Sequence, residues 1–188
     1  MVPDGGREVF VPPQGLSALA LDSQPSTITL SGEAFTQYLE EDGLDDVVAW
    51  RADAGQTKRE GRERYRRSMK VVLSGPDVRM GQPLELTSPS LPLSAWGPLD
   101  VTLRWKGAPV AGRLVRAWNH HLGTLVVMSA RTGPDGRVSF EVPWPGRWML
   151  SAVHMERAAP DAGAIDWEST WASMTFDVTP GSQPARSR

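Results

Sequence analysis

The C-terminal half of the chain is dominated by short stretches in which apolar and polar residues alternate. From Gly81 onward these stretches recur about every ten residues with turn residues between them, a spacing typical of a β-sandwich. In the last stretch Ala172, Met174, Phe176 and Val178 fall on one face of an extended chain, and the residues between them are polar. The expected strands are "PLELTS", "LDVTLRWKG", "GRLVRAWN", "TLVVMSA", "RVSFEV", "RWMLSAVHM" and "WASMTFDV".

The stretch "RWMLSAVHM" departs from simple alternation. One face of this predicted strand runs from Trp148 to His154, and the opposite face, which includes Val153 and Met155, is also apolar. A strand with two apolar faces is expected to be covered on both sides, because neither face is suited to water. We therefore expect another part of the chain, such as the N-terminal segment, to pack on the outside of the sandwich here.

The first 78 residues combine strand and helix patterns. "STITL" predicts a strand, and "SGEAFTQYLEEDGL" predicts a helix with Ser31 as its N-cap, Glu33 in its first turn and Gly43 at its end. "VVAWR" predicts a short strand. The charged segment "KREGRERYRRSMK" has two interpretations: a solvated helix with Glu–Arg pairs that leads into the strand "KVVLSG", or a contact for an anion or phosphate.

These patterns together predict a mainly β protein with an antiparallel, immunoglobulin-like sandwich. The sandwich is expected in residues 79–180, after a smaller α+β segment in residues 1–78. The last residues, 181–188, are rich in small and polar side chains and are expected to form a disordered tail.

Composition narrows the classes of function. The 188 residues carry 20 basic and 22 acidic side chains, and this net charge of −2 does not favour a nucleic-acid partner. No apolar run approaches the roughly 18 residues that a membrane-spanning helix needs. The absence of cysteine excludes disulfides, thiolate metal sites and cysteine nucleophiles. The first ten residues, "MVPDGGREVF", have no basic stretch followed by an apolar one, so we expect no signal peptide in this sequence.

Several stretches together resemble a known family. "GAPVAGRLVRAWN", "TGPDGRVSFEVPWPGRWMLSAVHM" and "DWESTWASMTFDV" are similar to the C-terminal half of the domains of unknown function described as NikM-like periplasmic components of nickel uptake. "PSTITLSGEAFTQYLEEDGLDDVVAWR" and "GRERYRRSMKVVLSG" are similar to the middle region of that family, so the resemblance extends from Pro25 to Val178. The combination of "AVHM" and "DWESTWA" is its most specific part.

The resemblance implies a prealbumin-like or carboxypeptidase-regulatory-like sandwich at the C-terminus. It also implies a periplasmic or otherwise extracytoplasmic protein in nickel or cobalt uptake or handling, with the metal ion and a membrane transport component as partners. Members of the family usually begin, after a signal peptide, with a strand that contains histidine and aromatic residues and with a further β-domain. That region is missing or very short here, so residues 1–78 are incomplete relative to the family.

The histidines are the first candidates for metal ligands, because nickel and cobalt accept imidazole and carboxylate ligands. His120 and His121 follow "AWN" and precede Leu122 and Gly123, which predicts a hairpin loop. Adjacent side chains on a regular strand point to opposite faces and could not share one metal, whereas in a loop they could. The alternative interpretation is an exposed polar turn without a ligand.

His154 is the central metal candidate. It ends a predicted strand and belongs to the "AVHM" stretch of the resemblance. Asp166 and Glu168, after the loop, are the expected oxygen ligands, and Glu156 and Asp161 are further carboxylates nearby. In the alternative interpretation His154 donates a hydrogen bond to a carboxylate or a backbone carbonyl and holds the loop in place. No HxH, HxxxH or HExxH spacing occurs, so spacing alone gives the metal hypothesis little support.

Seven of the eight tryptophans lie in the C-terminal half. We expect Trp105 and Trp148 in the core, because each ring buries a large area there. For Trp144 and Trp167 both a core position and a ligand-stacking position are open. A row of exposed, coplanar rings would favour a carbohydrate-binding surface.

No motif of the sequence predicts an enzyme. It contains no GxSxG motif, no glycine-rich phosphate loop and no paired-carboxylate signature. The leading hypothesis is a non-enzymatic extracytoplasmic accessory or binding protein in nickel or cobalt handling, with no cofactor other than such a metal. The alternatives are a structural or protein-interaction sandwich without metal, and a carbohydrate-binding module.

Overall fold

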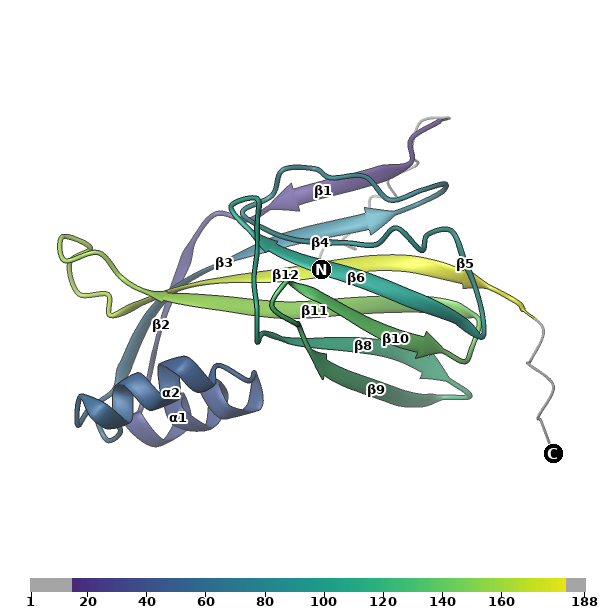
Figure 1. Ribbon diagram of the computed structural model, residues 1–188. Helices are drawn as coiled ribbons and strands as arrows, with labels where there is room; N and C mark the ends of the chain where they lie inside the picture. The colour runs from purple at the N-terminus through teal and green to yellow at the C-terminus, as the bar shows by residue number, and fades with distance from the viewer. Residues whose placement is uncertain (1–14, 182–188) are drawn as a thin grey trace, which may run out of the picture.

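The computed structural model describes residues 15–181 and shows two β-sheets and a pair of helices (Figure 1). The helices are α1 (Gly32–Glu41) and α2 (Asp45–Asp53). The strands are β1 (Ala18–Asp22), β2 (Ser26–Leu30), β3 (Gly61–Val72), β4 (Leu84–Thr87), β5 (Leu93–Ser94), β6 (Gly97–Trp105), β7 (Ala108–Pro109), β8 (Leu114–His121), β9 (Thr124–Arg131), β10 (Arg137–Val142), β11 (Gly146–Arg157) and β12 (Trp167–Thr179).

The two sheets form the predicted mainly β sandwich. The larger sheet has eight strands in the order β1-β3-β12-β11-β8-β9, with β2 paired to β3 and β5 paired to β12. The smaller sheet has four strands in the order β10-β6-β4, with β7 beside β6. The smaller sheet is antiparallel throughout, but β12 runs parallel to β3 and to β5. These parallel pairings differ from the fully antiparallel arrangement that we expected, and they make β3 and β12 neighbours.

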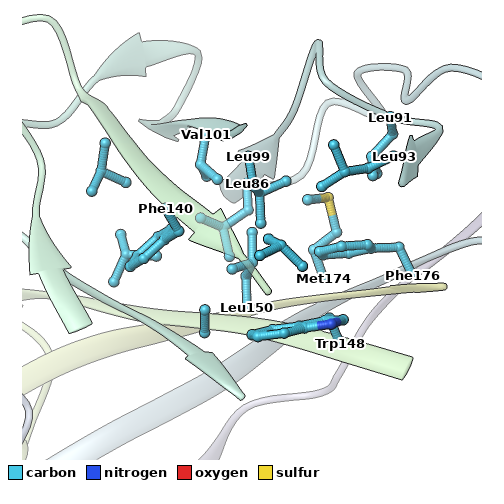
Figure 2. Packing of buried hydrophobic residues seen from close by; sticks show 14 of the residues in the cluster. Leu86, Leu91, Leu93, Leu99, Val101, Phe140, Trp148, Leu150, Met174 and Phe176 are labelled. Carbon is cyan, nitrogen blue, oxygen red and sulfur yellow. The ribbon is translucent and has the colours of Figure 1, made fainter. Parts of the chain in front are cut away.

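The main hydrophobic core lies between the two sheets (Figure 2). Alternation along β11 turns Trp148 and Leu150 toward the smaller sheet, and Met174 and Phe176 on β12 point the same way. The predicted core position of Trp148 is confirmed, because its side chain is fully buried. The smaller sheet contributes Leu86, Leu99, Val101 and Phe140 to this core.

The two helices cover the opposite face of the larger sheet and build a second core there. The Ser31 side chain accepts a hydrogen bond from the Ala34 amide, which confirms the predicted N-cap of α1. Phe35 of α1 packs in one cluster with Val153 and Met155 of β11. The prediction that this strand is covered on both faces is confirmed for its C-terminal part, where α1 and α2 provide the outer cover, whereas Met149 on the same outer face is exposed.

The strand predicted for "VVAWR" is wrong, because these residues belong to α2. Asp45 and Asp46 occupy the first turn of this helix, where carboxylates interact favourably with the positive end of the helix dipole. Val47 turns into the second core, and Val48 packs against its edge. Apolar residues that are adjacent in the sequence can thus share the buried side of a short helix.

The helix predicted for the charged segment is also wrong, because these residues form most of β3. β3 lies between β12 on one side and β1 and β2 on the other, so both edges of its backbone are hydrogen-bonded. Gly61 begins the strand directly beneath the Phe35 ring, where an added Cβ atom would lie 2.2 Å from a ring carbon. Tyr65 and Met69 lie on the face of this strand that is turned toward the helices.

The predicted boundary at residue 78 falls in the loop between β3 and β4. The strands before it, β1 to β3, are hydrogen-bonded into the same sheet as β11 and β12. Apart from Gly181, the predicted tail at 181–188 lies outside the described residues, as does the N-terminal segment 1–14. Neither helix in residues 15–181 is long and apolar enough to cross a membrane.

Candidate functional site

A cleft of about 550 Å³ opens where β3 and β12 extend past the edge of the smaller sheet. Its floor is formed by these two strands, and one wall is formed by Trp105 at the end of β6 and by Lys106 in the turn that follows. The other wall is the loop from Arg79 to Pro83. We call this space the arginine cleft, because Arg64 and Arg66 of the floor and Arg79 of the loop line it.

Strand register brings the polar residues of the floor into two neighbouring rows. In the outer row Arg64 of β3 lies beside Glu168 of β12, and Glu168 lies opposite Glu156 of β11. Like charges directly opposite each other are destabilising unless they are neutralised. Arg64 pairs with Glu168, and Lys106 approaches Glu156 to 3.6 Å, so both carboxylates have a cation partner.

The inner row consists of Arg66 of β3, Thr170 of β12 and His154 of β11. It is the last polar row before the sandwich core, since Ala172 and Ala152 follow it on β12 and β11. His154 lies on the Trp148 face as predicted, but it does not end the strand, because β11 continues to Arg157. His154 lies at the border between the core and the arginine cleft.

Both ring nitrogens of His154 have protein partners. Arg113 Nε, which can only donate, lies 3.2 Å from His154 Nδ1, so Nδ1 accepts this hydrogen bond. The proton of the neutral ring is then on Nε2, which lies 3.4 Å from Glu156 Oε1. Burial, and next the positive charge of Arg113, lower the pKa of His154 below its usual value. The tilted Trp105 ring, 4.8 Å away between centroids, covers the imidazole.

Glu156 connects His154 to the walls of the cleft. Trp105 Nε1 donates a hydrogen bond to Glu156 Oε1 at 3.0 Å. Partial burial opposes ionisation of Glu156, but the hydrogen bonds from His154 and Trp105 and the charge of Lys106 outweigh it and lower its pKa. Trp105 was expected in the core, but it is only half-buried: it packs against the edge of the core and places its indole N–H in the polar site.

The structure does not bring the predicted metal ligands together. Asp166 forms a two-pronged ion pair with Arg62, at 2.8 and 2.9 Å, and this hydrogen bonding lowers the pKa of Asp166. Glu168 is held by Arg64, and His154 by Arg113 and Glu156. Within residues 15–181 no three His, Asp or Glu side chains are arranged so that they could hold a metal ion.

His120 and His121 lie far from His154. They are the last residues of β8 rather than loop residues, and the turn consists of Leu122 and Gly123. On this strand the two adjacent side chains point to opposite faces, and His121 stacks on Trp144 at 4.6 Å. The preceding residue, Asn119, pairs with Trp148, six residues before His154 on β11. At about 3.3 Å per residue, Asn119 is already roughly 20 Å from His154 along the sheet, and the two histidines lie beyond it.

The arginine cleft has an excess of positive charge. Arg64, Arg66, Arg79 and Lys106 line it, against only two carboxylates, Glu156 and Glu168. The two carboxylates pair with Arg64 and Lys106. In the described part of the chain, Arg66 and Arg79 make neither an ion pair nor a side-chain hydrogen bond, so their guanidinium groups can bind a ligand.

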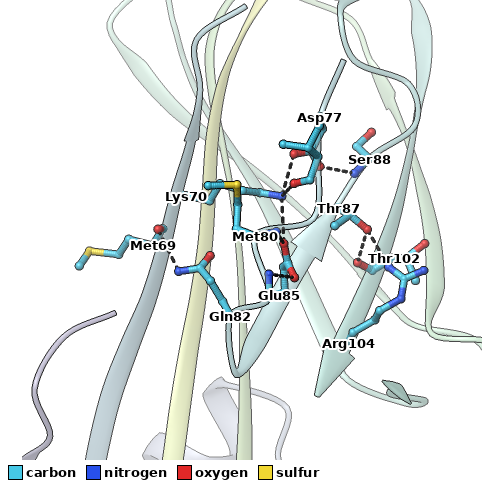
Figure 3. A network of polar contacts seen from close by, with 12 residues as sticks. Met69, Lys70, Asp77, Met80, Gln82, Glu85, Thr87, Ser88, Thr102 and Arg104 are labelled. Atoms are coloured by element: carbon cyan, nitrogen blue, oxygen red, sulfur yellow. Dashed lines mark hydrogen bonds and ion pairs between the residues drawn. The ribbon is translucent and has the colours of Figure 1, made fainter. Parts of the chain in front are cut away.

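A buried ionic network holds the loop that carries Arg79 (Figure 3). Lys70 Nζ lies 2.7 Å from Asp77 and 3.7 Å from Glu85, and all three side chains are at most 2 % exposed. Glu85 accepts hydrogen bonds from the backbone amides of Met80 and Gly81, and Asp77 accepts one from the Ser88 amide. The loop between β3 and β4 is therefore fixed on both sides of Arg79.

Sequence reasoning missed this network and both walls of the cleft. In "PLELTS" the alternation places Glu85 on the face opposite Leu84 and Leu86, yet all three are buried. The charged segment was the one usable signal, since one of its two interpretations was an anion contact. That interpretation matches the position of Arg64 and Arg66 in the cleft.

The tryptophans do not form an exposed row in the described residues. Trp167 is buried in the second core, and Trp144 packs against the main core. Trp50 and Trp96 are the most exposed, and they lie on α2 and in the turn before β6. The described residues therefore lack the row of exposed, coplanar tryptophan rings that would have favoured a carbohydrate-binding surface.

Comparison with known proteins gives one match. The family model described as a domain of unknown function (DUF4198) matches residues 5–156, which is most of the chain. The matched region includes the helices, β3, the loop with Arg79 and β11 as far as Glu156. No curated protein and no solved structure matches the chain.

Proposed function

Since the chain belongs to the DUF4198 family, whose description assigns no activity, we propose from the structure that it is a non-enzymatic binding protein for an anionic ligand. The observation that carries this proposal is the pair of unpartnered guanidinium groups, Arg66 and Arg79, in a cleft with excess positive charge. This local excess occurs in a chain with a net charge of −2. A concave site of opposite charge concentrates anions at its mouth.

The chemistry of the lining favours a carboxylate or phosphate ligand. A guanidinium group presents a planar fork of N–H donors that matches these two anions. Trp105 adds an apolar surface beside the charged groups, so the ligand is expected to carry an organic part as well. A volume of about 550 Å³ is in the range of small-molecule sites, roughly 300–1,000 Å³.

A binding role, in contrast to a catalytic one, is also supported by the contacts of the His154, Glu156 and Glu168 side chains. His154 uses both ring nitrogens within the protein, and Glu156 and Glu168 each have a cationic partner. General acid–base catalysis needs a group within reach of the substrate proton and free to exchange it. In this site the titratable side chains orient the walls, and the guanidinium groups of Arg66 and Arg79 face the ligand.

The proposal includes the role in nickel or cobalt handling that the resemblance implies, with the metal bound as part of an anionic complex. The metal would arrive already chelated by carboxylates, and the cleft would bind the anionic complex through Arg66 and Arg79. This form is supported because the described residues assemble no metal ligand set, whereas the lining of the cleft has an excess of positive charge. On this proposal the protein is extracytoplasmic, its sandwich is of the prealbumin-like kind, and a membrane transport component receives the ligand.

Isothermal titration calorimetry on the full chain tests the proposal. The titrants are citrate, inorganic phosphate, free Ni²⁺ and Co²⁺, and the preformed nickel–citrate complex. We expect saturable binding of citrate or phosphate that becomes at least tenfold weaker in the double variant Arg66→Gln/Arg79→Gln, equivalent to about 1.4 kcal/mol. The matched control is Arg137→Gln/Arg147→Gln, which removes the same charge from two exposed arginines outside the cleft.

Three results would count against the proposal or change it. Equal weakening in both double variants would show a general charge effect and no site. The absence of heat with every anion would leave the sandwich as a protein-interaction module. Binding of free Ni²⁺ or Co²⁺ that disappears in a folded His154→Ala variant would replace the anion proposal with direct coordination by His154.

A further inference from the structure

The face of β3 and β12 that points away from the arginine cleft carries a second, smaller pocket. It has a volume of about 200 Å³ and lies at the corner where α1 and β2 meet β3 (Figure 1). Three aromatic side chains line it: Tyr38 of α1, Tyr65 of β3 and Trp171 of β12. We call it the aromatic pocket. Ile28 and Leu30 of β2 close one side, and Arg67 of β3 also lines the pocket, but most of the lining is apolar.

A buried carboxylate, that of Glu63, also lines this pocket. The Glu63 residue is only 2 % exposed, and its Oε1 accepts hydrogen bonds from the Tyr38 hydroxyl at 3.2 Å and from the Ser169 hydroxyl. Among residues 15–181, no Lys, Arg or His forms an ion pair with Glu63, and no donor reaches its Oε2. A buried carboxylate without a cation is costly, and burial raises the pKa of Glu63.

The ring arrangement suits a cation. Tyr38 and Trp171 stack on each other, with 5.8 Å between ring centroids and 13° between planes, and both rings border the pocket. Tyr65 already has a cation near its face, because the Arg67 guanidinium lies 6.0 Å from the ring centroid. Ring faces carry partial negative charge and attract ammonium groups, most strongly where water is excluded.

We propose that the aromatic pocket binds an organic ammonium group, with Glu63 as its counter-charge and Tyr38, Tyr65 and Trp171 around its alkyl substituents. Arg67 is the other charged residue of the lining, but among the described residues it forms no ion pair with Glu63, so a purely apolar ligand would leave this carboxylate without a cationic partner. A bare metal ion would have only one carboxylate ligand in this pocket, because most of the other lining side chains are aromatic or aliphatic. A volume of about 200 Å³ restricts the ligand to a compact head group. A free alkylammonium compound and a lysine side chain of another protein share this chemistry.

Choline and its neutral isostere 3,3-dimethylbutan-1-ol test the charge requirement, because they differ only in a nitrogen or a carbon at the branched centre. Titration of the full chain is followed by tryptophan fluorescence, to which Trp171 contributes, and by calorimetry. We expect saturable choline binding and at least tenfold weaker binding of the alcohol. Nα-acetyl-lysine methylamide and its ε-trimethyl form distinguish the sources: tighter binding than choline indicates a lysine side chain, and weaker binding a free small molecule.

Two variants locate the ligand. Glu63→Gln removes the charge but keeps an acceptor for Tyr38 and Ser169, and it should weaken choline binding at least tenfold. Glu33→Gln is the matched control, because it makes the same charge change at an exposed position of α1. Should Glu63→Gln fail to fold, Tyr65→Ala against Tyr65→Phe tests the aromatic lining at a half-buried position, and only the alanine variant should lose affinity.

The proposal is overturned by any of four results. These are the absence of binding by every ammonium probe, equal affinity for choline and the neutral alcohol, unchanged affinity in folded Glu63→Gln, and equal affinity of the two Tyr65 variants. The pocket is independent of the arginine cleft, since alternation along β3 sends Glu63 and Tyr65 to one face and Arg64 and Arg66 to the other. The double variant Arg66→Gln/Arg79→Gln should therefore still bind choline.

Discussion

His154 shows how one residue can join a core to a site. Its imidazole lies between Arg113 and Glu156, and Trp105 covers it. The native protein keeps this ring neutral, because burial and then the charge of Arg113 lower its pKa, whereas the unfolded chain takes up a proton near pH 6.5. Its contribution to stability is therefore complete above about pH 6.5 and is lost as the pH falls from there toward the lower native pKa.

The variant His154→Asn tests this linkage, because an amide oxygen can still accept the hydrogen bond from Arg113. The melting temperature of the parent should fall more steeply than that of the variant between pH 6.5 and 5, and the two should run parallel between pH 7 and 8. Thermal unfolding followed by circular dichroism gives both profiles. His120→Asn, at an exposed position, should keep the parental slope. Parallel profiles of parent and His154→Asn over the whole range would contradict the prediction.

At the scale of elements, the loop between β3 and β4 depends on buried charges. Glu85 accepts the amide hydrogen bonds of Met80 and Gly81 and lies near Lys70, so the loop is fixed beside Arg79. Glu85→Gln keeps the shape of the side chain but weakens both bonds, because a charged acceptor binds an amide more strongly than a neutral one.

Hydrogen exchange measured by NMR checks this role of Glu85. We expect the Met80 and Gly81 amides to exchange at least tenfold faster in Glu85→Gln than in the parent. The amide of Phe140 on β10, in the same smaller sheet, serves as the internal control and should keep its rate. A uniform increase at all three amides would instead indicate global destabilisation. Unchanged rates at Met80 and Gly81 would show that the loop is held without Glu85.

The sequence best predicted those helices and strands that have one face buried in a core and the other face exposed to water. The seven strands expected after Gly81 are all present, because alternation with a period of two reports a half-buried strand directly. The α1 helix was found from its cap at Ser31 for a similarly local reason. The charged part of β3 was missed because its residues have the composition of a solvated helix, and only its central place in the sheet makes it a strand, whereas its end was predicted in "KVVLSG".

The candidate site could be predicted only in part, for a reason of topology. Strand alternation placed His154 correctly on the Trp148 face, although β11 continues to Arg157 and His154 does not end the strand. The arginine cleft, in contrast, depends on the parallel pairing of β3 with β12, which sets Arg64 beside Glu168 across more than a hundred residues. No pattern in the sequence of β3 or of β12 alone predicts that these two strands pair. Asp166 was expected to bind metal, but the same pairing places it beside Arg62.

At the scale of the whole molecule, the larger sheet separates two apolar cores that share the same strands. β11 turns Trp148 and Leu150 into the sandwich core and Val153 and Met155 into the core beneath the helices. A strand that contributes to both cores cannot lose one without disturbing the other. We therefore expect the helices and the sandwich to unfold in one cooperative transition.

Phe35→Ala tests this coupling from the helical side, because Phe35 is fully buried and far from the sandwich core. Deleting a buried phenylalanine side chain costs about 3–5 kcal/mol. Urea unfolding should show this full loss in a single transition, with coincident curves from far-ultraviolet circular dichroism and tryptophan fluorescence. Fluorescence reports both cores, since Trp148 lies in one and Trp167 in the other. Glu40→Ala, on the exposed face of α1, should change stability little. Two separate transitions in Phe35→Ala would show that the sandwich is stable without its helical cover.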